Sequence, residues 1–92
     1  MKMVMIMFSF KLYISGTSKR NLELTSAMET ALDSFLKDQY QLNVINLLKN
    51  SHSALEDNVL VTPTLIKIEP KPALRFIGDF TDANVLKKLL VQ

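Results

Sequence analysis

Alternation of apolar and polar residues predicts two β-strands in the first half of the chain. Residues 7–14 have one face made of Phe8, Phe10, Leu12 and Ile14 and the other of Ser9, Lys11 and Tyr13. Residues 41–47 alternate again, with Leu42 and Val44 on one side and Ile45 and Leu47 on the other. Because both faces of the second segment carry apolar side chains, we expect a strand that is covered on both sides.

The segment between these strands has the spacing of an amphipathic helix. Residues 15–18 supply turn residues and a hydroxyl that can cap a helix start. After them, apolar residues recur every three or four positions, at Leu24, Met28, Ala31, Leu32, Phe35 and Leu36. The pattern predicts a long helix that ends near Lys37 and joins two parallel strands.

The second half of the chain predicts a short helix, a hairpin and a closing helix. Ser53 and Glu56 have the spacing of a capping box, and Thr62–Pro63 ends the helix that follows. Its narrow apolar stripe is Ala54, Leu55 and Val59. Residues 65–68 and 73–77 form the hairpin, around a turn with two prolines. Thr81 caps the last helix, whose stripe is Val85, Leu86, Leu89 and Leu90.

The predicted order is βαβαββα in one α/β domain over residues 1–92, which is the layout of a thioredoxin-like fold. Another small αβ sandwich also satisfies the local rules. Pro63 lies where thioredoxin-like folds carry a cis-proline beside the active loop, and its alternative role is a plain helix stop.

Composition removes several classes of function. The net charge is +2, and its eleven basic and nine acidic residues are scattered, so nucleic-acid binding is not indicated. The chain has no cysteine, which excludes disulfides, a thiol nucleophile and a thiolate metal site, and is compatible with the cytoplasm. The first apolar run is far shorter than the about 20 residues of a membrane span, so we expect no membrane segment.

Few residues are candidates for chemistry. The turn from Ser15 to Arg20 takes the place of a thioredoxin's cysteine pair and carries two cations at a helix start, which indicates either an anionic contact or a solvated helix end. A glutathione-transferase-like reaction would need Tyr13, Ser15 or Thr17 to activate a thiol. His52 stands alone and is expected at the surface. Lys67 and Arg75 lie on neighbouring strands, and we expect them to share one face.

Several segments resemble the KaiB family of circadian clock proteins. They are Lys11-Leu-Tyr-Ile-Ser-Gly16, residues 42–50 (LNVINLLKN), Glu56-Asp57, Val61-Thr-Pro-Thr-Leu65, Lys67 and Arg75-Phe-Ile-Gly-Asp79. The resemblance implies a non-enzymatic adaptor, without a cofactor or metal, that docks on a KaiC-type ATPase hexamer. Further implied partners are KaiA, a histidine kinase, or copies of the chain in a dimer or tetramer. The matching cations, and hence the candidate partner-binding residues, are Lys11, Lys49, Lys67 and Arg75.

The sequence also departs from the clock proteins. KaiB proteins are metamorphic, and residues typical of their ground-state ending are replaced here by Leu89 and Val91. We therefore expect a bias toward the thioredoxin-like state. Glu23, Asn43 and Asn58 occupy sites that usually carry Arg or Lys in clock KaiB proteins. A second hypothesis is accordingly a thioredoxin-like signalling domain outside the clock, such as one in a stress response.

Overall fold

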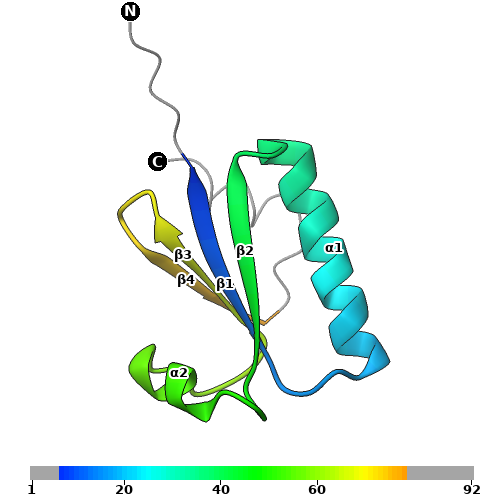
Figure 1. Ribbon diagram of the computed structural model, residues 1–92, viewed down its shortest axis with the longest axis vertical. Helices are drawn as coiled ribbons and strands as arrows, with labels where there is room; N and C mark the ends of the chain where they lie inside the picture. Colours follow the sequence, from blue (N-terminus) through cyan, green and yellow to red (C-terminus); the bar gives the residue numbers. More distant parts are fainter. Residues whose placement is uncertain (1–6, 79–92) are drawn as a thin grey trace, which may run out of the picture.

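A computed structural model describes residues 7–78, which form a four-stranded sheet with a helix on each face (Figure 1). The elements are β1 (Phe8–Ile14), α1 (Lys19–Leu36), β2 (Tyr40–Asn46), α2 (Ser51–Glu56), β3 (Thr64–Glu69) and β4 (Leu74–Ile77). The order βαβαββ agrees with the predicted order as far as the description extends. The predicted helix after Thr81, including Leu89 and Val91, lies outside the described residues.

The strands are arranged β2-β1-β3-β4. β1 and β2 are parallel and are joined by α1, whereas β3 runs antiparallel to β1 and β4 antiparallel to β3. This confirms the predicted crossover and hairpin and gives a thioredoxin-like α/β arrangement. Because β1 and β2 are parallel and β3 begins opposite the end of β1, the segments 15–18, 47–50 and 60–63 meet at one end of the sheet.

Strand alternation divides the apolar residues into two cores. On the α1 side, Phe10, Leu12, Ile14 and Leu65 are buried against Met28 and Leu32 of α1. On the α2 side, Tyr13, Ile45 and Ile66 pack with Ala54 and Val59. The assignment of alternate residues of β1 and β2 to opposite faces was predicted correctly. Within the described residues, neither helix is long and apolar enough to cross a membrane.

Helix α1 begins where the sequence indicated. Ser18 is its N-cap, and the Ser18 side chain accepts a hydrogen bond of 3.3 Å from the Asn21 backbone N–H. This bond supplies a partner for one of the amide groups that a helix start leaves unpaired. The helix ends at Leu36, close to the predicted boundary, and Lys37 follows with a positive φ of 57°.

Helix α2 differs from its prediction. It begins at Ser51 after an N-cap at Asn50, so Ser53 lies inside the helix and caps nothing. Only Ala54 of the helix is buried, and Leu55 is 75% exposed. Of the predicted stripe, Ala54 and Val59 are buried in the α2-side core, and Val59 lies after the end of the helix, whereas the prediction for Leu55 is wrong. A six-residue helix has fewer than two turns, so few of its positions face the sheet.

Candidate functional site

The end of α2 is attached to the sheet by four side chains, which we call the α2 clamp: Lys11, Tyr13, Asp57 and Arg75. β1 contributes Lys11 and Tyr13, which are two positions apart and therefore point to the same face. Lys11 Nζ lies 3.0 Å from Asp57 Oδ2, and the fully buried Tyr13 donates its hydroxyl hydrogen to the same oxygen. The Tyr13 hydroxyl is also 3.1 Å from the carbonyl oxygen of Ser53.

Arg75 holds the same helix end from β4. One guanidinium nitrogen donates to the carbonyl of Asn58 at 3.0 Å, and another donates to the carbonyl of Asp57. Carbonyls at a helix C-terminus lack intrahelical partners and carry partial negative charge, so a cation is favourable there. Lys11 and Arg75 stand in one row across the sheet, with Ile66 paired to both. The two cations thus hold the end of α2 from opposite sides of Ile66.

The α2 clamp lowers the pKa of Asp57 and raises the pKa of Tyr13. Burial alone would raise the pKa of Asp57, but the hydrogen bonds from Tyr13 and Lys11 outweigh it, and the pKa lies below its usual value. Burial, followed by the hydrogen bond to Asp57, raises the pKa of Tyr13 well above its usual value. The resulting state is an ionised Asp57 with a neutral Tyr13. A phenol held in this way cannot activate a thiol, which argues against the glutathione-transferase-like alternative for Tyr13.

The structure separates the four candidate partner-binding cations. Lys11 and Arg75 belong to the α2 clamp, and Lys49 is exposed in the turn between β2 and α2. Lys67 is fully buried on the α1 side, where burial lowers its pKa. The predicted shared face of Lys67 and Arg75 is wrong, because Arg75 pairs with Ile66 and Lys67 pairs with Leu74. Directly paired residues point to the same face, so Lys67 and Arg75 point to opposite faces.

A second feature lies where β1 and β2 end. The Thr62–Pro63 peptide bond is cis, which is the isomer expected for this position of the fold. A cavity of about 660 Å³ separates this loop from the first half of α1. Among the described residues its lining includes Ser15, Arg20, Asn21, Thr62 and Pro63. Lys19 makes an exposed ion pair of 3.9 Å with Glu23, and His52 is exposed as predicted.

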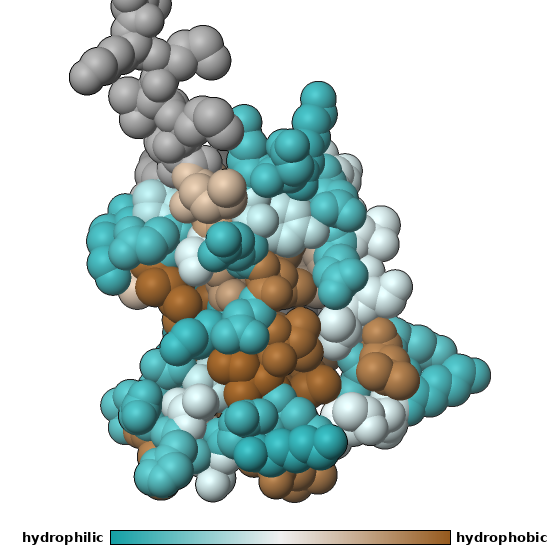
Figure 2. Space-filling model, viewed as in Figure 1, coloured by the Kyte–Doolittle hydropathy of each residue, from teal (hydrophilic) through white to brown (hydrophobic). Residues whose placement is uncertain are grey.

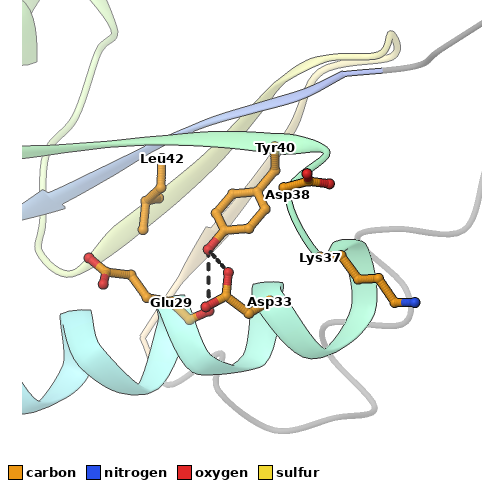
Figure 3. Close-up of a pocket in the computed structure, with 6 residues that line it drawn as sticks. All are labelled: Glu29, Asp33, Lys37, Asp38, Tyr40 and Leu42. Atoms are coloured by element: carbon orange, nitrogen blue, oxygen red, sulfur yellow. Dashed lines mark hydrogen bonds between the residues drawn. The ribbon is translucent and has the colours of Figure 1, made fainter.

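A third feature is a shallow depression of about 650 Å³ between β2 and the last turns of α1 (Figure 3). Tyr40 reaches from β2 to α1, and its hydroxyl is 2.5 Å from Asp33 Oδ1 and 3.3 Å from the carbonyl oxygen of Glu29. Burial and the bond to Asp33 raise the pKa of Tyr40 to about 12. The tyrosine is therefore a neutral donor that joins the crossover helix to the edge strand.

No group of three potential metal ligands occurs within residues 7–78.

The family follows from comparison with known proteins. A family model described as "KaiB domain" matches residues 11–91. The chain belongs to the KaiB family. The circadian clock oscillator protein KaiB of Synechococcus sp. (strain CC9311) is 40% identical over 75 residues, which cover 82% of this chain and 63% of that protein. KaiB of Prochlorococcus marinus (strain NATL2A) is also 40% identical over 75 residues, with 70% of its length covered. The resemblance found in the sequence is therefore confirmed.

Solved structures agree on the fold of this KaiB-family chain. The N-terminal domain of Synechococcus elongatus SasA matches with a TM-score of 0.80 and 24% identity, over 98% of this chain and 89% of that domain. Chloroplastic thioredoxin z matches with a TM-score of 0.72 and 17% identity, over 90% and 74% of the two chains. At these identities the similarity concerns the fold, and it confirms the thioredoxin-like prediction.

Asp57 is the residue of the α2 clamp that sequence reasoning missed. It was recognised only as part of a matching Glu56-Asp57 pair. The available signal was the alternation of Lys11 and Tyr13, which puts a cation and a phenol on the face that a second helix must cover. A carboxylate at the end of that helix is the complementary group.

Proposed function

We propose that this KaiB-family protein is a non-enzymatic cytoplasmic adaptor that binds a KaiC-type ATPase hexamer. The observation that carries the proposal is the family match over residues 11–91, together with curated relatives that are named circadian clock oscillator proteins. KaiA or a histidine kinase would then be a further partner. The lack of cysteine and the occupied hydroxyl of Tyr13 support a binding role in preference to thiol chemistry.

The four family-matching cations contribute to this function in different ways. Lys49 is exposed and free to meet a partner's carboxylate. Lys11 and Arg75 act indirectly, since their bonds to Asp57 and Asn58 fix the position of α2, which follows the exposed turn that carries Lys49. Lys67 is buried in the α1-side core, so it affects binding only through the stability of that core. Binding affinity should therefore respond directly to Lys49 and, for the other three, through changes in stability.

The proposal is tested by size-exclusion chromatography with light scattering. The protein is run alone and then after long incubation with the KaiC-type ATPase from the same source and ATP, with a thioredoxin of similar mass as the control for non-specific association. Co-elution with the hexamer, and none for the control, is the expected result. The run without ATPase gives the mass of the free protein and decides between monomer, dimer and tetramer.

An ATPase that hydrolyses ATP normally but retains none of the protein would contradict the adaptor role. That outcome would favour the alternative of a thioredoxin-like signalling domain outside the clock. The measurement therefore separates the two hypotheses without a rhythm assay.

A further inference from the structure

Exposed large apolar side chains gather at the end of the sheet where β1 and β2 finish. Five of them, which we call the apolar end, belong to this region by topology: Leu22, Leu48, Leu60, Val61 and Ile77, with exposures of 55, 74, 93, 48 and 63%. Leu22 is in the first turn of α1, and Ile77 pairs with Thr64, the first residue of β3. In the view of Figure 2, smaller hydrophobic areas lie toward the lower end of the molecule among hydrophilic side chains, and the largest hydrophobic area lies at mid-height.

These five apolar side chains are largely exposed to solvent, so packing within the described residues does not explain them. Leu60 is nearly as accessible as in an extended chain, so its side chain contributes little to the stability of the described residues. Scattered exposed leucines are ordinary on protein surfaces, but a group of them at one end is typical of an interaction site. The cavity between Pro63 and Arg20 adds a concave element beside the group.

The charges at the same end are mainly positive. Lys19, Arg20 and Lys49 are exposed there, and the carboxylate of Glu23, in the first half of α1, is paired with Lys19. Helix α1 has no acidic residue in its first turn, so Lys19 and Arg20 meet the positive end of its dipole. The three carboxylates of the depression in Figure 3 belong to the second half of α1 and the turn that follows it. A carboxylate-bearing partner would relieve the unfavourable charge at the apolar end.

We infer that the apolar end is the surface that docks on the ATPase of the proposed function, and that the segment of the ATPase it receives carries apolar side chains flanked by Asp or Glu. This inference rests on the proposed function and specifies its interface. Apolar anchors surrounded by complementary charge are the usual composition of a protein-protein interface. An anionic membrane is less suitable, since polybasic membrane-binding segments carry about four to eight cations, whereas the described residues of this end supply Lys19, Arg20 and Lys49.

The chain offers matched control variants. Leu60→Ser removes an apolar group from the apolar end, whereas Leu55→Ser removes a 75% exposed leucine from α2, outside the five residues of the apolar end. Lys49→Glu reverses a charge at the apolar end, and Lys37→Glu reverses one at the far end of α1. All four positions are exposed, so we expect every variant to fold, and circular dichroism with thermal melting verifies this.

The experiment is a titration of the immobilised protein with the ATPase hexamer and ATP, read by interferometry at low and high salt. Leu60→Ser should weaken binding about tenfold or more, whereas Leu55→Ser should change it by less than about twofold. Lys49→Glu should weaken binding and reduce its dependence on salt, and Lys37→Glu should do neither.

Each other outcome overturns the inference in a recognisable way. If the wild-type protein binds but Leu60→Ser and Leu55→Ser behave alike, the interface is wrong and the proposed function stands. If the wild-type protein does not bind an active ATPase, both fail together. Retention on phosphatidylserine vesicles that Leu60→Ser abolishes would make the apolar end a membrane contact. A mass that rises with protein concentration, and no longer rises in Leu60→Ser, would make it a contact between copies.

Discussion

Lys11 and Asp57, which are 46 residues apart in the sequence, meet across the α2 face of the sheet with 3.0 Å between Nζ and Oδ2. Their contact matters because α2 has only six residues and buries only Ala54. A helix this short has no appreciable stability of its own in water. Its position must therefore come from tertiary contacts, of which the α2 clamp supplies the polar part.

Replacing Asp57 by Asn should destabilise the protein. Asn lacks the charge that attracts Lys11 and accepts the Tyr13 hydrogen, so two charge-assisted bonds become weaker neutral ones or are lost. We expect the free energy of unfolding in urea to fall by about 1–3 kcal/mol. Glu56→Gln is the control, because Glu56 is exposed and forms no ion pair among the described residues. Equal effects of the two variants would contradict the α2 clamp.

The stability that Asp57 provides should depend on pH. Its folded-state pKa is depressed, so its contribution is complete above the unfolded pKa, about 3.9, and is lost as pH falls through the folded value. The difference in unfolding free energy between the wild type and Asp57→Asn should thus be constant from neutral pH to about pH 5 and shrink below about pH 4. Urea titrations of both proteins at several pH values measure it. A difference that grows on acidification would reverse the sign and exclude the mechanism.

The two tyrosines give an independent measurement, since the chain has no tryptophan. Both have raised pKa values, that of Tyr40 to about 12 and that of Tyr13 further. The stabilisation they give is complete below the unfolded pKa of about 10 and is lost as pH rises through the folded values. Ultraviolet titration of the native protein should therefore detect little tyrosinate at about pH 10, whereas the urea-unfolded chain should be about half ionised. Tyr13→Phe and Tyr40→Phe assign each step, and a native tyrosine that titrates normally would contradict its assigned hydrogen bond.

The elements that the sequence predicted well are those in which a repeated pattern decides the structure. The alternation in β1 assigns Phe10 and Tyr13 to opposite cores because the period of a strand is two and both cores exist. The cap at Ser18 is a local property, since the hydroxyl bonds an amide only three residues away. Residue type and short-range spacing are enough to predict features of this kind.

The features that were predicted incorrectly depend on register and on partners distant in the sequence. The hairpin was recognised, but nothing in the segment 65–77 alone fixes whether Arg75 pairs with Ile66 or with Lys67, and one residue of slip exchanges the faces. The burial of Lys67 follows from that register. The role of Asp57 depends on β1 lying beneath α2, which only the assembled sheet provides.

Arg75 should control the local stability of α2. Its guanidinium donates to the carbonyls of both Asp57 and Asn58, and Asn58 has a positive φ of 55° at the helix end. Arg75→Gln should accelerate hydrogen exchange of the amides at positions 57–59, which bond back into α2. The free energy of unfolding should fall by about 0.5–1.5 kcal/mol.

The matched variants separate the geometry of Arg75 from its charge. Arg75→Lys keeps the charge without the planar fork that meets two carbonyls, and should recover only part of the loss. Lys49→Gln removes an exposed cation just before α2 and should leave exchange at positions 57–59 unchanged. If Lys at position 75 restores full protection, charge at the helix end is sufficient. If Arg75→Gln leaves protection intact, the α2 clamp consists of Lys11, Tyr13 and Asp57 alone.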